Sequence, residues 1–341
     1  MSYADQLATL FDTRMLVVNP SECALAGMDK FEKLGTPPAS FENIKSAEEW
    51  QAIRAAYRDP VAFGLPPMPT FRQKWMDNGR ARAETKLIDG PRGKLEMRMI
   101  VPEREIKGAL FHTHGGAWVL GDPSTFDDKY AQAADLCGLV VGSVDYRKAP
   151  EHPYPEPIND CEAAALWFND HVKQRYGINN VLIHGISAGG QMSAVVALRM
   201  HLQHGYQYAG AVHEIGLYDF TNSLPSRTRV DGRCLGMDSK TCIDAASAFL
   251  PDTADRTDPD VSPLYARNDQ LEGLGPTLLT CCELDPLCDD SLLYFMRQLE
   301  AGNDAYLVVF NGIGHNLDTL DCEEAELNVA VIAAFMSRCI A

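Results

Sequence analysis

The sequence predicts an α/β fold in which a mostly parallel sheet is covered by helices on both faces. Two observations support this: the 341-residue length suits one large domain or a domain with a substantial cap, and from Leu87 onward short apolar runs alternate with longer helical patterns. The expected strands lie near Leu95–Val101, Ala109–His112, Leu139–Val144, Val181–His184, Gly210–Ile215, Thr277–Cys281 and Ala305–Phe310. The expected helices lie near Phe126–Cys137, Pro157–Arg175, Ala188–Gln203, Asp290–Ala301 and Cys322–Arg338. In such sheets the chemistry lies at the carboxyl ends of the strands.

Two segments interrupt this pattern. Residues 1–80 contain helical stretches such as Ser46–Arg58, separated by the proline-rich runs GTPPAS and GLPPMPT, with little strand signal. A second helical insertion, at about 217–250, follows the strand that ends at Ile215. We expect both segments to form a cap over a catalytic domain of residues 81–341. A flexible arm is the alternative for the N-terminal region.

Composition and charge limit the classes of partner. Hydrophobic residues make up 46% of the chain, charged residues make up 23%, and the formal net charge is −17, so attraction to nucleic acid or to anionic lipid is not expected. The first residues lack the basic start and apolar core of a signal peptide, and no run approaches the ~18 apolar residues that span a bilayer. We therefore expect a soluble cytoplasmic protein.

The cysteines and histidines give little sign of a disulfide framework or a metal site. Ten cysteines show no C-x-x-C pair and no regular spacing, so we expect free buried thiols. His112 and His114 alternate in a strand-like run, but no second Cys/His pair stands at ligand spacing elsewhere. Zinc is therefore not expected.

The run VLIHGISAGG places Ser187 between glycines where an apolar strand gives way to a helix. This context favours a nucleophile elbow, a turn so tight that the serine takes a positive φ and its neighbours must lack bulk. The alternative is an ordinary turn, because isolated G-x-S-x-G matches are common. A serine nucleophile also needs a base within hydrogen-bond reach and a third group to orient that base.

Later strand ends supply both groups. Asp285 follows the strand beginning at Thr277 and precedes a proline, which makes it the preferred acid. Asp289 and Asp290 are the alternatives, although we expect them to cap the next helix. His315 follows the last strand in a glycine-rich loop and completes the order Ser, Asp, His. The other histidines considered lie inside a strand or at a helix end: His213, His201 and His204.

Acyl transfer also needs donors for the oxyanion, and loss of one donor typically lowers the rate by about 10²–10³-fold. The run HGGAW follows an expected strand, and Gly115 and Gly116 offer backbone N–H groups without side-chain bulk. The N–H of Ala188, directly after the nucleophile, would join them. Alone, HGG could be a turn, but its place before the G-x-S-x-G segment favours the oxyanion role.

Taken together, these motifs resemble the hormone-sensitive-lipase-like (family IV) carboxylesterases of the α/β-hydrolase superfamily. The resemblance extends from about His112 to His315 and rests on HGGAW, DYRKAPEHPYP, GISAGG, DPDVSPL, DPLCDD and GIGH. It implies an α/β-hydrolase fold with an eight-stranded sheet, a helical cap and no cofactor. The catalytic residues it implies are Ser187, Asp285 and His315, and the oxyanion donors are Gly115, Gly116 and Ala188.

The sequence departs from the family at two positions. Ala117 stands where the family usually has a third glycine, which predicts a modest reshaping of the loop. Ile186 stands before the serine in place of the common Asp or Thr, so any hydrogen bond made by that residue is absent.

We expect a serine esterase that acts on small or medium carboxylic esters. An amidase or peptidase could use the same triad, and a non-catalytic receptor is the third reading, although the receptor branch of the family lacks the histidine that is present here as His315. Long-chain lipase activity is disfavoured by the lack of a large apolar lid. Finally, Ala305–Phe310 would be an apolar edge strand, which predicts a homodimer paired through it.

Overall fold

The computed structural model describes residues 2–34, 46–58, 68–229, 237–315 and 317–341. A single sheet of nine strands runs through this part of the chain in the order β1-β9-β8-β7-β6-β4-β5-β3-β2. All neighbouring pairs are parallel except β2 with β3 and β3 with β5. The strands are β1 Met15–Val18, β2 Glu84–Gly90, β3 Gly93–Ile100, β4 Gly108–Thr113, β5 Leu139–Asp145, β6 Val181–Ile186, β7 Gly210–Glu214, β8 Thr277–Cys282 and β9 Ala305–Phe310.

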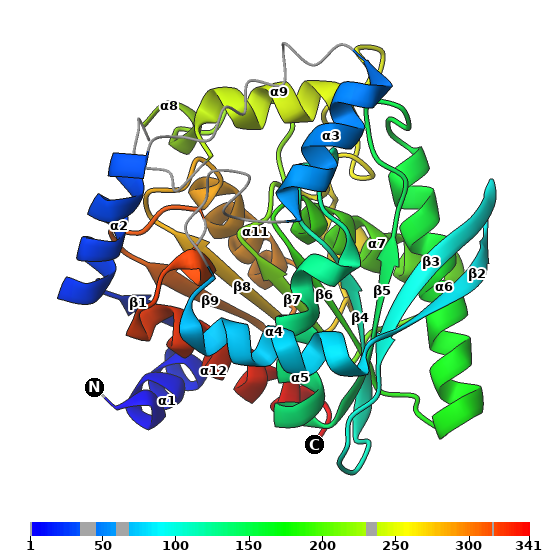
Figure 1. Ribbon diagram of the computed structural model, residues 1–341, viewed down its shortest axis with the longest axis horizontal. Coiled ribbons are helices and arrows are strands. Elements are labelled where there is room, and N and C mark those ends of the chain that lie inside the picture. Colours follow the sequence, from blue (N-terminus) through cyan, green and yellow to red (C-terminus); the bar gives the residue numbers. More distant parts are fainter. Residues whose placement is uncertain (1, 35–45, 59–67, 230–236, 316) are drawn as a thin grey trace.

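Helices cover both faces of this sheet (Figure 1). The described helices are α1 Tyr3–Thr13, α2 Glu22–Leu34, α3 Ala47–Tyr57, α4 Thr70–Arg82, α5 Asp127–Cys137, α6 Glu156–Tyr176, α7 Ala188–His204, α8 Ser226–Arg229, α9 Ser239–Phe249, α10 Asn268–Leu271, α11 Cys288–Glu300 and α12 Glu323–Cys339. Short 3₁₀ turns are η2 Pro123–Phe126, η3 Pro263–Tyr265 and η4 Leu317–Thr319. The sequence therefore predicted the α/β class correctly, and each of its seven expected strands has a counterpart.

The central strands are apolar on both sides because helices bury both faces. Leu110, Leu182 and Val212 belong to one apolar cluster, which they share with residues of α5 and α12. Their neighbours Phe111 and Ile183 belong to another cluster, which contains residues of α6 and α7. Alternate residues of each strand thus face opposite helical layers, and the carboxyl ends of the parallel strands are left to the loops.

The sheet has one more strand than the family resemblance implies. That strand, β1, lies outside β9 and forms the edge of the sheet in its place. β1 pairs with β9 in parallel register, with Leu16 opposite Val308, and the carbonyl of Arg14 accepts the N–H of Leu307 at 2.9 Å. The expectation that β9 forms an open edge is therefore wrong. The dimer predicted through that edge loses its structural basis, since a strand of the same chain already occupies the pairing position.

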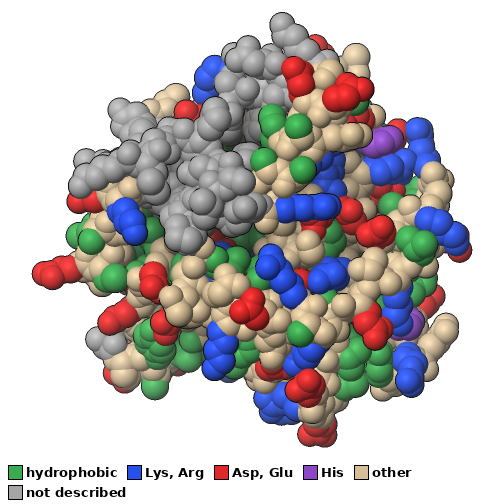
Figure 2. Space-filling model, in the orientation of Figure 1, with side chains coloured by type: hydrophobic (Ala, Val, Ile, Leu, Met, Phe, Trp, Pro, Cys, Tyr) green, Lys and Arg blue, Asp and Glu red, His purple; other side chains and the backbone are tan. Residues whose placement is uncertain are grey.

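The N-terminal helices α1, α3 and α4 lie in three different places. The helix α4 lies along α5, and α1 lies near β1 and α12, whereas α3 lies on the side of the molecule where α9 is found (Figure 1). No helix in the described ranges is long and apolar enough to cross a membrane. On the described part of the face in Figure 2, acidic and basic side chains are interspersed.

We predict that the buried face of β1 contributes to stability and that its exposed face does not. Leu16 is 2% exposed and Val17 is 49% exposed, although the two residues are adjacent. Leu16→Ala should lower the free energy of unfolding by about 2 kcal/mol, through lost burial and the space left behind. The matched variant Val17→Ala should change it by less than about 0.5 kcal/mol. Urea denaturation measures both, and equal effects would show that β1 does not dock on β9 in solution.

Candidate active site

Ser187 lies in a tight turn between the end of β6 and the start of α7, with φ 57° and ψ −122°. The backbone is closely packed around it. A Cβ added to Gly185 would lie 2.0 Å from the carbonyl oxygen of Gly189, and one added to Gly189 would lie 2.1 Å from the carbonyl oxygen of Thr113. Only glycine fits at either position, so the strand can turn directly into the helix and present the serine side chain at the turn.

The structure brings the three predicted triad residues together. The Oγ of Ser187 lies 2.9 Å from Nε2 of His315, and Nδ1 of the same ring lies 2.7 Å from Oδ2 of Asp285. Asp285 is fully buried, and its other carboxylate oxygen accepts the N–H of Leu287 at 2.8 Å. When Nδ1–H donates to the carboxylate, Nε2 is free to accept the serine proton. This is the arrangement that a general base requires.

The alternative acids, Asp289 and Asp290, serve a different purpose. Both lie in the first turn of α11, near its positive end as expected, but neither is the N-cap residue, which is Leu287 and makes no side-chain cap. Asp290 accepts the N–H groups of Tyr218 and Asp219 at 2.7 and 2.9 Å, and Asp289 accepts the N–H of Ser226 at 2.8 Å. The two carboxylates therefore fasten the inserted segment to α11.

Each of the other histidines considered has a place away from this triad. His213 lies 2.8 Å from the hydroxyl of Ser193, and His204 pairs with Glu162 at 2.8 Å. His201 lies in the last turn of α7. His112 contacts the hydroxyls of Ser143 and Tyr130, at 3.2 and 3.1 Å. Within the described ranges, no group of three or more His, Cys, Asp or Glu side chains is placed to hold a metal ion.

The glycine loop after β4 passes beside the serine. A Cβ added to Gly115 would lie 3.5 Å from the Cβ of Ser187. The carbonyl oxygen of Gly115 lies 2.8 Å from Nδ1 of His114, whose pKa is lowered to about 4 by burial and by the nearby Lys148, so the neutral ring donates this hydrogen bond. Because C=O and N–H point in opposite directions across a trans peptide, the N–H of Gly116 points away from His114.

The N–H of Ala188 completes the set of predicted oxyanion donors. Ala188 is the first residue of α7, and the first N–H groups of a helix have no partner within it. Gly115, Gly116 and Ala188 thus all lie at the carboxyl ends of β4 and β6, next to the nucleophile. We propose that their backbone N–H groups donate to a negatively charged oxygen formed near Ser187.

The two departures from the family pattern have structural consequences. Ala117 and the following Trp118 both have positive φ, at 54° and 61°, which explains why glycine is common at the first of these positions. The strained turn is anchored by Trp118, whose indole N–H donates to Gln191 of α7 at 3.1 Å and whose ring stacks on Phe249 of α9. Ile186 is buried in the same apolar cluster as Leu182.

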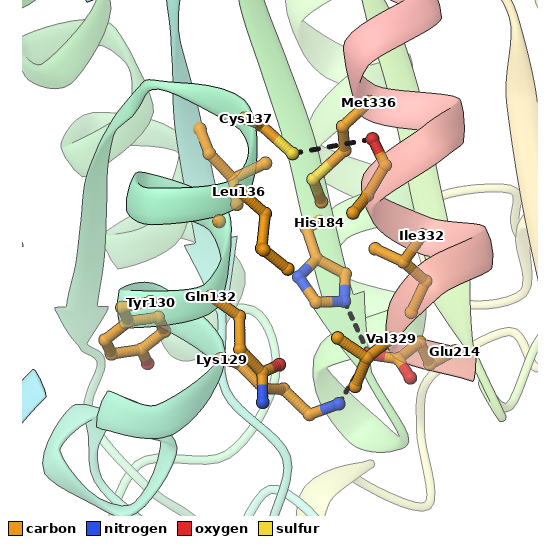
Figure 3. A pocket seen from close by; sticks show the side chains of 13 residues that line it. Lys129, Tyr130, Gln132, Leu136, Cys137, His184, Glu214, Val329, Ile332 and Met336 are labelled. Carbon is orange, nitrogen blue, oxygen red and sulfur yellow. Dashed lines mark hydrogen bonds and ion pairs between the residues drawn. The ribbon is translucent and has the colours of Figure 1, made fainter. Parts of the chain in front are cut away.

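Sequence reasoning missed a charged group behind the serine. Figure 3 shows Lys129 reaching from α5, and His184 from β6, to the same carboxylate of Glu214 at the end of β7. The distances are 2.9 Å from Lys129 Nζ and 2.8 Å from His184 Nε2. Burial acts to raise the pKa of Glu214, but Lys129 and His184 outweigh it and hold that pKa below its usual range. The available signal was an acidic residue at the end of a short strand that is apolar apart from His213.

The comparisons with known proteins agree with this architecture. Residues 110–319 match the model of the α/β-hydrolase-fold family. Esterase LipI of Mycobacterium tuberculosis is 31% identical over 253 residues, which cover 72% of this chain and 73% of LipI. An arylesterase of Saccharolobus solfataricus is 29% identical over 273 residues, 78% of this chain and 84% of that protein.

The chain therefore belongs to the α/β-hydrolase family. Within that family it is a member of the hormone-sensitive-lipase-like group, as its motifs indicated. Among solved structures, it is similar to the hyperthermophilic esterase of the archaeon Pyrobaculum calidifontis, with a TM-score of 0.79 and 25% identity over 95% of this chain and all of that one.

We predict that the close packing at the elbow makes Gly189 irreplaceable. In Gly189→Ala the new methyl would meet the backbone carbonyls of Thr113 and His114, which cannot move without shifting β4. Activity should fall by at least about 10²-fold, because the nucleophile would be displaced. Gly205→Ala is the matched control at the other end of α7, where φ is +62° and no atom lies within 4 Å. It should cost about 1 kcal/mol of stability and leave turnover unchanged. Equal activity in the two variants would contradict the packing described.

Proposed function

We propose that this chain is a serine carboxylesterase that hydrolyses small to medium carboxylic esters through an acyl-enzyme. The observation that carries the proposal is the 2.9 Å separation between Ser187 Oγ and His315 Nε2, with Asp285 on the far side of the ring. The relatives named as esterases support the class of carboxylic ester hydrolase. The roles of individual residues follow from geometry and are part of the proposal.

In the proposed mechanism, Ser187 attacks the ester carbonyl while His315 takes its proton. The buried carboxylate of Asp285 stabilises the imidazolium that forms and fixes the tautomer of the ring. The oxyanion receives the N–H groups of Gly115, Gly116 and Ala188. His315 then returns the proton to the leaving alcohol, and a water molecule activated by the same ring releases the acid from the serine.

Contacts near the glycine loop support a cap role for both added segments. Arg54 of α3 donates to the carbonyls of Val119 and Ala149 at 2.8 and 3.0 Å, so the N-terminal segment contacts the chain just after the oxyanion loop. From the insertion, Phe249 stacks on Trp118, and Phe220 lies 5.1 Å from Trp118 between ring centroids. This buried aromatic group restricts the space beside the loop, which favours short acyl or alcohol groups.

We also propose a cytoplasmic location. All nine cysteines in the described ranges are free, and seven of them are buried. Free thiols in this number suit a reducing compartment, because an oxidising one favours disulfides. The proposed partner is a small ester, with no cofactor, nucleic acid or membrane.

We predict that Ser187→Ala abolishes hydrolysis of p-nitrophenyl esters without unfolding the protein. Asp285→Asn should lower kcat by about 10⁴-fold, because the amide favours the wrong imidazole tautomer. Asp289→Asn is the matched control, since Asp289 only fastens the insertion to α11. A series of esters from acetate to palmitate should give the highest rates with the shorter acyl chains.

Circular dichroism is the measurement that checks whether each variant is folded. Turnover above a few per cent in folded Ser187→Ala would rule out this nucleophile. If Asp289→Asn lowered kcat by several orders of magnitude and Asp285→Asn did not, Asp285 would be the wrong choice of catalytic acid.

A further inference from the structure

The loop that carries His315 is held by a side chain from the N-terminal segment. Downstream of the histidine the chain forms η4, which contains Asp318. Nη1 of Arg72, in α4, lies 3.0 Å from the carbonyl oxygen of Asp318 and 3.3 Å from its carboxylate. The two residues are 246 positions apart in the sequence. An element outside the catalytic strands thus contacts the loop of the proposed base directly.

Arg72 is itself firmly placed. Its Nε lies 2.6 Å from the carboxylate of Asp128 in α5, and the two residues are only 7% and 1% exposed. The helix α4 lies alongside α5 (Figure 1). A planar guanidinium that binds two acidic partners at this depth cannot rotate away without leaving a buried charge unpaired. The position of Asp318 is therefore tied to that of α5.

The neighbouring residue on α5 extends the connection to the serine. Lys129 lies 4.0 Å from the carboxylate of Asp318 and 2.9 Å from that of Glu214, and Figure 3 shows its contact with Glu214. The backbone carbonyl of Glu214 accepts the N–H of Ser187 at 2.8 Å. Two ion pairs of Lys129 and one backbone hydrogen bond of Ser187 thus link the serine turn to η4.

We propose that Arg72 is a positioning residue, which acts through Asp318 to set the place of His315 relative to Ser187. The inference rests on the proposed triad. Proton transfer depends on a hydrogen bond between the two side chains, and a misplacement of about 1 Å can lower the rate by about 10²-fold. No described contact joins Arg72 to Ser187 or His315 themselves. Its loss should therefore lower kcat rather than weaken substrate binding.

The test compares two arginines of the same helix. Arg72→Met should lower kcat for p-nitrophenyl acetate by about 10²-fold, with KM changed by less than about threefold. Arg82→Met is the matched control: Arg82 pairs with Asp135 of α5 at 2.8 Å, so this variant also loses an ion pair between α4 and α5. It leaves the histidine loop untouched and should keep the wild-type kcat. Arg72→Lys should have a higher kcat than Arg72→Met, because lysine retains the positive charge but lacks the planar guanidinium that binds two partners at once.

A folded Arg72→Met with the kcat of Arg82→Met would overturn the proposal. Should Arg72→Met fail to fold because Asp128 is left unpaired, Asp318→Ala decides the question. That variant keeps the Arg72–Asp128 pair and the contact of Arg72 with the carbonyl of residue 318, and it removes only the contact with the carboxylate. It should therefore lower kcat by a smaller factor, about tenfold, whereas wild-type kcat would overturn the proposal. Ser187→Ala, assayed in parallel, distinguishes a failure of the proposed triad from a failure of the role proposed for Arg72. Turnover in Ser187→Ala would refute the triad itself. An inactive Ser187→Ala together with a fully active Asp318→Ala would refute only the role of Arg72.

Discussion

The close approach of Gly185 to Gly189 is the constraint on which the site depends. Because these two residues lack side chains, β6 can turn into α7 within a single residue, and Ser187 is held at φ 57°. A non-glycine residue in that conformation costs about 1–3 kcal/mol, so the surrounding structure must enforce it. Here the sheet does so, through the hydrogen bond from Ser187 N–H to the carbonyl of Glu214 on the adjacent strand.

The other two residues of the proposed triad, Asp285 and His315, follow strands β8 and β9, and side chains from the added segments contact the chain next to both. In the insertion, Arg227 forms an ion pair with Asp290 at 2.8 Å and donates to the carbonyl of Pro286, the residue after Asp285. In the N-terminal segment, Arg72 contacts the histidine loop in a comparable way. Each loop is thus braced by a buried arginine from outside the main sheet. Both added segments therefore contact the loops that carry residues of the proposed triad.

Sequence reasoning was reliable where the signal was local and failed where it was not. The buried parallel strands are mostly apolar, and the glycines around Ser187, Gly115 and His315 mark places where the backbone must pass closely, so both could be found from the sequence. β1 could not, since four residues in a helical region reveal no partner and their partner strand lies almost 300 positions away. β2 was missed because its sequence, ETKLIDG, is largely polar and mostly exposed. The contacts of Arg72 likewise depend on tertiary packing alone.

The central claim is that Ser187 is the nucleophile and that His315 activates it, and covalent labelling tests this most directly. The protein would be treated with diethyl p-nitrophenyl phosphate, which phosphorylates an activated serine and releases p-nitrophenol, and the modified peptide would be located by mass spectrometry. If Ser187 is the nucleophile, the protein should release one equivalent of p-nitrophenol, lose all esterase activity and carry a single adduct, on Ser187. Full activity after treatment, or an adduct on another residue that accounts for the inactivation, would contradict this claim.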